Sequence, residues 1–142
     1  MRYLGLDLGS RTLGISTSDP SLTIASSLKV IRHNEEYERL VHEVKKITEE
    51  YQITKIVLGL PKNMNNTIGE KANLSYKFKE MLEKETNIEV VLEDERLTTT
   101  LANHMLLEFD TSRKKRKQVV DQIAATIILQ SYLDREKNKK EN

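Results

Sequence analysis

Three short strand-like segments follow one another in the N-terminal part of the chain, and no helical pattern separates them. Residues 3–8 alternate between leucines and other residues, and residues 13–18 form a second such segment after a tight turn. A connection this short favours a hairpin. Asp19-Pro20 marks another turn, and we expect a third strand within residues 24–31. Three successive antiparallel strands argue against a fold that alternates strands and helices from its start.

The rest of the sequence alternates between helical and strand-like patterns. A helix that Asn34 can cap carries Leu40, Val44, Ile47 and Tyr51 at helical spacing. The remaining expected elements are a strand at 55–60, a helix at 69–85, a strand at 89–93, a helix from about Thr98 and a last helix around 120–128. The order β-β-β-α-β-α-β-α-α predicts an α/β fold, with one mixed five-stranded sheet and helices on both faces.

The length of 142 residues fits one domain. We expect this domain at residues 1–134 and a charged, disordered tail at residues 135–142, because the tail mixes charges and lacks apolar anchors. The absence of cysteine excludes disulfides, thiolate zinc sites and a cysteine nucleophile. No apolar stretch resembles a signal peptide or a membrane span, so we expect a cytoplasmic protein without a membrane partner.

Three acidic residues from distant parts of the chain are candidates for one site. Asp7 lies in an otherwise apolar strand that we expect to be central, where a carboxylate needs a cation, donors or solvent. Glu95 directly follows the last strand, and sites in open α/β sheets gather at the carboxyl ends of strands. Asp94 is its substitute, because the sequence does not fix the strand phase. Asp121 opens the last helix, beside a face of small residues.

A cluster of carboxylate oxygens suits hard cations such as Mg²⁺ or Mn²⁺. Two such ions, about 3.5–4 Å apart, activate a water and stabilise the leaving oxygen in phosphodiester hydrolysis. Because the metals supply the nucleophile, the chain needs no serine, histidine or cysteine for that role. His33, His42 and His104 lack metal-ligand spacing, and we expect them at the surface.

Each acid taken alone also has a purely structural interpretation. Asp7 can be a structural acid satisfied by local donors, and Asp94-Glu95-Arg96 can be a solvated loop with a local ion pair. Asp121 can be a first-turn acid that interacts with the helix dipole. Only the joint occurrence of the three acids in this topology favours a metal-dependent nuclease.

Four motifs together resemble a known family. They are residues 4–14, residues 57–64, residues 94–99, and residues 112–117 with the segment 120–130. In this order and spacing they are similar to the bacterial Holliday-junction-resolvase-like proteins, also called pre-16S rRNA nucleases, of the RNase H-like superfamily. The resemblance implies an RNase H-like fold with Asp7, Glu95 and Asp121 as metal-binding catalytic acids. It further implies 5′-end processing of the small-subunit rRNA precursor, with resolution of branched DNA as the alternative.

Basic residues near the acids are candidate contacts to the phosphates of RNA or branched DNA. The candidates are the run Arg113, Lys114, Lys115, Arg116 and Lys117, the flanking residues Arg11 and Arg96, and Asn63. The run lies just before the helix that carries Asp121, and Lys and Arg contacts to phosphate are independent of base sequence. A solvated charged loop, and a turn at Asn63, are the structural alternatives. We expect a monomer or a weak homodimer.

Two other functions stay open at this point. Residues 6–10 with Gly14 also resemble the first phosphate loop of actin-like ATPases and sugar kinases, which clamp a nucleotide between two such domains. A non-catalytic RNA-binding module for ribosome assembly is the other possibility. Aromatic residues make up only 5% of the chain, so we do not expect binding by base stacking.

Overall fold

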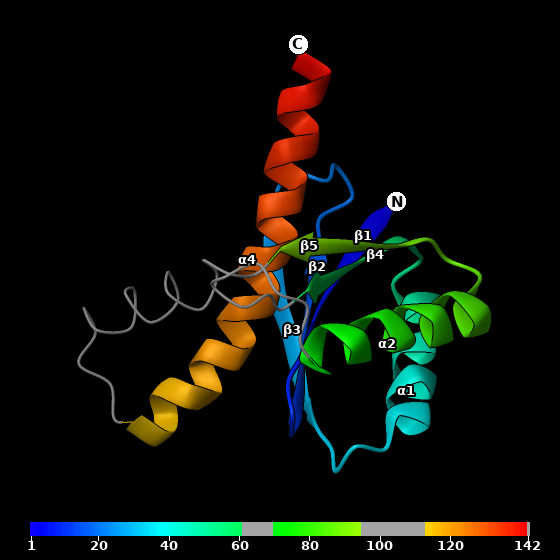
Figure 1. Ribbon diagram of the computed structural model, residues 1–142. Coiled ribbons are helices and arrows are strands. Elements are labelled where there is room, and N and C mark those ends of the chain that lie inside the picture. Colours follow the sequence, from blue (N-terminus) through cyan, green and yellow to red (C-terminus); the bar gives the residue numbers. More distant parts are fainter. Residues whose placement is uncertain (61–69, 95–112, 142) are drawn as a thin grey trace.

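The computed structural model describes residues 1–60, 70–94 and 113–141, and side chains are described for residues 1–60, 73–94 and 123–139. In chain order, the elements are β1 (Arg2–Leu8), β2 (Thr12–Ser18), β3 (Ala25–Arg32), α1 (Tyr37–Glu50), β4 (Ile53–Leu60), α2 (Glu70–Thr86), β5 (Val90–Asp94) and α4 (Arg113–Glu141) (Figure 1). The predicted helix from about Thr98 lies outside the described residues.

The five strands form one mixed sheet with the order β3-β2-β1-β4-β5. β2 pairs antiparallel with both β1 and β3, as the short N-terminal connections predicted. β4 pairs parallel with both β1 and β5. The predicted mixed five-stranded sheet is therefore confirmed, and β1 is its central strand.

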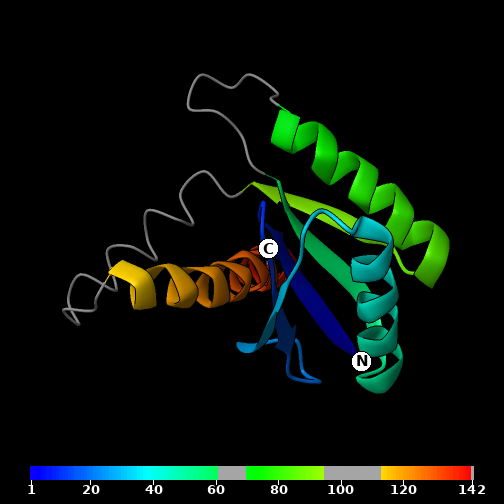
Figure 2. The same cartoon turned by 90° about the horizontal axis from the view of Figure 1, so that it is seen from below.

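Helices cover both faces of the sheet, also as predicted. In Figure 2, α1 and α2 lie on one side and α4 on the other. The larger core lies between the sheet and the pair α1/α2, and its buried residues are Leu4, Leu6, Leu13, Ile15, Leu40, Val41, Val44, Ile47, Ile53, Ile56, Leu58, Phe78, Leu82 and Val90. A smaller cluster under α4 contains Ala25, Val57, Ile128, Leu129, Tyr132 and Leu133. Within the described residues, no helix is long and apolar enough to cross a membrane.

The start of α1 differs from the prediction. Glu36, not Asn34, is the residue before the helix, and no side chain caps its N-terminus. The Asn34 side chain instead accepts a hydrogen bond from Arg11, at 3.0 Å. His33 was expected at the surface but is buried, because its ring bonds the backbone at Gly9 and Glu35. His42 is exposed, and His104 lies outside the described residues.

The start of α4 also differs from the prediction. The helix begins at Arg113, so the backbone of the basic run up to Lys117 is helical rather than a preceding loop. Lys and Arg are good helix formers, and this run extends the helix without any apolar periodicity. Asp121 therefore lies inside the helix, and the first-turn interpretation of Asp121 is wrong, because the first turn of α4 holds no acidic residue.

The C-terminal end of α4 contains the segment that was expected to be disordered. Residues 135–141 are helical and continue α4 without a break. Arg135 forms an ion pair with Glu93 of β5, and Lys139 pairs with Glu136 one helical turn away. These contacts and the good helix-forming residues of the segment favour a helix. The expectation of disorder rested on the mixed charges and the lack of apolar anchors.

Candidate functional site

Asp7 lies near the carboxyl end of the central strand β1, directly opposite Gly14 of β2, and is partly buried. The register across the parallel strands runs from Leu6 through Leu58 to Leu92, so the carboxyl ends of β1, β4 and β5 meet at one edge of the sheet. The strand assignment of Asp7 and its central position are therefore as predicted. This edge is where open α/β sheets commonly carry their sites.

The strand period assigns Asp7 to the face covered by α4. Side chains alternate along a strand, so Tyr3, Gly5 and Asp7 share one face. The ring of Tyr3 lies 6.1 Å from the ring of Tyr132 in α4. A Cβ on Gly5 would lie only 2.7 Å from the Cβ of Leu129 in the same helix.

α4 runs antiparallel to β1 along this face. Tyr3 faces Tyr132, and two residues later Gly5 faces the helix at Leu129 and, further towards its N-terminus, at the Ala125 carbonyl. The lack of a side chain at Gly5 allows this approach, since its Cβ would lie 2.9 Å from the Ala125 oxygen. The end of β1 that carries Asp7 therefore points towards the N-terminal half of α4.

Directional hydrogen bonds hold α4 at this position. The buried Ser16 hydroxyl donates to the carbonyl of Ala125 at 2.8 Å. The Gln130 side chain accepts from the backbone N–H of Ala25 at 2.8 Å and donates to the carbonyl of Thr23 at 2.9 Å. These contacts were not predicted: Ser16 is a polar residue in no distinctive motif, and Gln130, although it ends the motif segment 120–130, was given no role.

Glu93 is an acid at this edge that the sequence did not single out. Its side chain is only 7% exposed, and Arg135 of α4 donates to it through two nitrogens, at 2.7 and 2.5 Å. The hydrogen bond and charge of Glu93 raise the pKa of the Arg135 guanidinium. Since Val90, Val91 and Leu92 are apolar on both faces of β5, their pattern did not reveal which face Glu93 occupies.

The same contact fixes the phase of β5 and therefore the face of Asp94. Glu93 contacts α4, whereas Leu92 packs against the α1/α2 core. Asp94, the last residue of β5, alternates with Glu93 and shares the face of Leu92. Asp94 thus lies on the face of the sheet opposite to that of Asp7.

Several predicted site residues lie outside the described part of the chain. These are Glu95, Arg96 and Asn63, and the side chains of Arg113, Lys114, Lys115, Arg116, Lys117 and Asp121. Among the side chains that are described, no three histidine or acidic groups are grouped so that they could hold a metal ion. Of the basic candidates, Arg11 is described: it is exposed in the turn between β1 and β2.

The mixed five-stranded sheet with helices on both faces is an RNase H-like fold. Residues 1–135 match the model of the RuvX family, described as Holliday junction resolvase, and the chain belongs to this family. A protein of Listeria monocytogenes serotype 4b, named "Putative pre-16S rRNA nuclease", is 50% identical over 135 residues, covering 94% of this chain and 98% of the relative. A protein of Natranaerobius thermophilus with the same name is 45% identical over the full length of both chains.

Solved structures show the same fold at low sequence identity. Thermus thermophilus RuvC in complex with a Holliday junction substrate matches with a TM-score of 0.62 and 14% identity, over 97% of this chain and 96% of that one. A ROK hexokinase from the same organism matches with a TM-score of 0.50 and 23% identity, over 73% of this chain but only 38% of the kinase. At these identities, both matches are evidence for the fold alone.

Proposed function

We propose that this chain is a divalent-metal-dependent nuclease that hydrolyses phosphodiester bonds in the precursor of 16S rRNA, in the cytoplasm. Membership of the RuvX family and the names of its relatives support the reaction class and the substrate. The structural observation that supports this proposal most directly is the packing of α4 on the face of β1 that holds Asp7.

That packing supports a meeting of Asp7 with Asp121. From Gly5 to Asp7 the strand advances by about 6.6 Å, and from Ala125 back to Asp121 the helix advances by about 6 Å. Gly5 and Ala125 are in contact range, and the two elements run antiparallel. Because the two advances are similar in length and point the same way, Asp7 on β1 and Asp121 on α4 should lie close together. We therefore assign these two residues to one acidic site.

We assign the third carboxylate to Glu95 rather than to Asp94. Asp94 shares the face of Leu92, on the side of α1 and α2, whereas the proposed site faces α4. One further residue along the chain returns to the α4 face if the strand period continues. Asp7, Glu95 and Asp121 would then supply only oxygen ligands, which suit Mg²⁺ or Mn²⁺. When bound, two such ions would activate a water and neutralise the leaving oxygen.

Two alternatives share the same site and differ in what they bind. Branched DNA is the second candidate substrate, because the RuvX family is described as Holliday junction resolvase. A non-catalytic ribosome-assembly factor would bind RNA and leave it intact. Nucleotide binding as in sugar kinases is less well supported, since those enzymes need a second domain and this chain spans only 38% of the matched hexokinase.

The decisive experiment incubates the purified protein with precursor 16S rRNA, and in parallel with a four-way DNA junction, in Mg²⁺ or Mn²⁺. Asp7→Asn should lose cleavage by about a hundredfold or more, as removal of a key electrostatic group at an active site does. Asp94→Asn is the matched control, since it removes a neighbouring charge on the opposite face, and it should cleave like the wild type. Equal cleavage by Asp7→Asn and wild type would contradict the nuclease proposal.

A further inference from the structure

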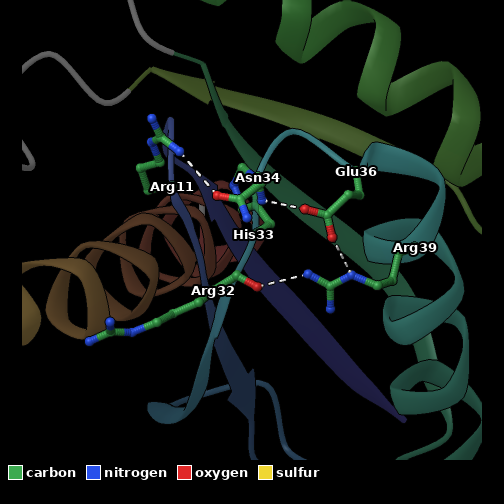
Figure 3. A pocket seen from close by; sticks show the side chains of 6 residues that line it. All are labelled: Arg11, Arg32, His33, Asn34, Glu36 and Arg39. Atoms are coloured by element: carbon green, nitrogen blue, oxygen red, sulfur yellow. Dashed lines mark hydrogen bonds and ion pairs between the residues drawn. The ribbon is translucent and has the colours of Figure 1, made fainter.

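An open pocket of about 440 Å³ lies where β3 leads into α1 (Figure 3). Its lining residues are Arg11, Arg32, His33, Asn34, Glu36 and Arg39. Arg11 comes from the turn between β1 and β2, Arg32 ends β3, and Arg39 lies in the first turn of α1. Three arginines from three separate parts of the fold therefore line one hollow, and in Figure 3 the side chain of Arg32 extends outward from it.

The pocket carries a net positive charge. Its lining residues include three arginines and a single acidic residue, Glu36, which pairs with Arg39. The backbone N–H of Asn34, at 2.6 Å, and the side chain of Arg39 hold the pKa of Glu36 below its usual value, so this carboxylate stays ionised. Two positive charges remain uncompensated (three minus one), and such an excess favours an anion.

Two of the arginines are held in place and still keep donors for a ligand. One nitrogen of Arg11 donates to the Asn34 side chain at 3.0 Å. Arg39 donates to Glu36 at 2.8 Å and to the backbone carbonyl of Arg32 at 2.9 Å. A guanidinium has five N–H donors, so most of them remain for a ligand. The Arg32 side chain makes no hydrogen bond or ion pair with any described residue, and in Figure 3 it extends away from Arg39.

A buried histidine connects the floor of the pocket to the strand of Asp7. Nδ1 of His33 accepts the backbone N–H of Glu35 at 3.0 Å, so the opposite nitrogen, Nε2, donates to the carbonyl of Gly9, also at 3.0 Å. This bond holds Glu35 in a left-handed conformation with φ of 66°, which is unfavourable for glutamate. Gly9 is two residues beyond Asp7, so the pocket lies at the same end of the sheet as the proposed acidic site.

We propose that this pocket binds a backbone phosphate of the nucleic-acid strand, adjacent to the bond that is cut. The inference rests on the proposed nuclease function and adds Arg32 and Arg39 to Arg11 as binding residues. Guanidinium groups match the geometry of phosphate oxygens and bind them through paired donors. None of the described residues that line the pocket offers an exposed aromatic ring for base stacking, so the expected contacts are to phosphate.

Binding without cleavage tests this pocket independently of catalysis. A fluorescently labelled single-stranded RNA is titrated with protein in EDTA, where no divalent metal supports hydrolysis, and a DNA of the same sequence is titrated in parallel. The variants are Arg32→Gln and the double variant Arg11→Gln/Arg32→Gln. Lys137→Gln is the matched control: it removes one exposed charge from the C-terminal part of α4, which Figure 1 shows at the opposite end of the sheet from the start of α1.

We expect Arg32→Gln to weaken binding by about fivefold and the double variant by about twentyfold, the size expected for lost charge-assisted contacts. The dependence of log affinity on log salt should become shallower by about 0.7 for each lost phosphate contact with a single strand. Lys137→Gln should change neither quantity. Equal losses with RNA and DNA support recognition of the phosphate, and a loss confined to RNA would contradict it.

Wild-type affinity and salt dependence in the double variant, with an unchanged midpoint of thermal unfolding, would overturn the phosphate pocket. That result would leave the nuclease proposal intact, because cleavage is tested separately through Asp7. Conversely, a protein that never cuts but still loses binding in the double variant would refute the nuclease function and retain the binding site.

Discussion

The two faces of the sheet are held by different kinds of contact. The core under α1 and α2 is built from buried aliphatic side chains and Phe78. The face under α4 has a smaller apolar cluster and adds specific polar contacts, such as Ser16 to Ala125 and Arg135 to Glu93. Apolar burial is non-directional, whereas hydrogen bonds have strict geometry. We infer that one face mainly stabilises the domain and that the other fixes the position of α4.

The largest expected effect on stability is in the α1/α2 core. Leu82 of α2 is fully buried there, and Leu82→Ala should lower the free energy of unfolding by about 2–5 kcal/mol. Denaturant unfolding measures this loss. Cleavage per folded molecule should stay near the wild-type rate, because no contact of α4 is touched. A folded Leu82→Ala protein without activity would contradict the division between the two faces.

Gly5→Ala should lower the free energy of unfolding less than Leu82→Ala does, but it should reduce the cleavage rate more. Its Cβ would clash with the Ser16 hydroxyl and would lie 2.7 Å from the Cβ of Leu129 and 2.9 Å from the Ala125 oxygen, so both Ser16 and α4 have to move. Overpacking of this kind costs about 1–3 kcal/mol. A displacement of about 1 Å can lower the rate by about a hundredfold, so cleavage should fall steeply in protein that is still folded. Normal cleavage would show that the site tolerates movement of α4.

Smaller effects on stability are expected when either of two buried hydroxyl groups is removed, and only one of the two should also affect cleavage. Ser16 bonds α4 across the interface, whereas Thr48 bonds Lys45 within its own helix α1. Ser16→Ala and Thr48→Ala should each cost about 0.5–1.5 kcal/mol in the free energy of unfolding. Only Ser16→Ala should also reduce cleavage. If both variants keep full activity, the Ser16 bond does not position the site.

The smallest effect is expected at the exposed turn between β2 and β3, and it depends on pH. The Ser21 hydroxyl and the backbone N–H groups of Ile24 and Thr23 lower the pKa of Asp19 from 3.8 to about 2. The folded form has the lower pKa, so this stabilisation is full above pH 3.8 and disappears as the pH falls through about 2. The stability difference between wild type and Asp19→Ala should therefore be constant near neutral pH and narrow in acid. A difference that stays constant down to pH 2 would contradict the role of the carboxylate.

The fold was largely predictable because apolar periodicity reports directly on buried faces. Alternation in residues 3–8 identified the central strand, and Leu40, Val44 and Ile47 identified the buried face of α1. The ends of helices were less predictable. Asn34 has the chemistry of a cap, but it bonds Arg11, a residue far away in the sequence.

The site was predictable only in part. Asp7 stood out because it is an acid in an apolar strand. Glu93 and Arg135 were not predicted, because their pairing depends on how α4 crosses β5, and nothing in the sequence distinguishes either residue from an ordinary surface charge. The pocket lined by Arg11, Arg32 and Arg39 was not predicted for the same reason, since only the fold brings these distant residues to one pocket.

Calorimetric titration of Mn²⁺ tests most directly whether the α4 face gathers the acids into one site. The proteins are the wild type and the single variants Asp7→Asn, Glu95→Gln, Asp121→Asn and Asp94→Asn. We predict that the first three variants each weaken Mn²⁺ binding by at least about tenfold, while Asp94→Asn, on the opposite face, binds like the wild type. Wild-type affinity in Asp7→Asn, or a loss in Asp94→Asn with none in Glu95→Gln, would contradict a shared site under α4.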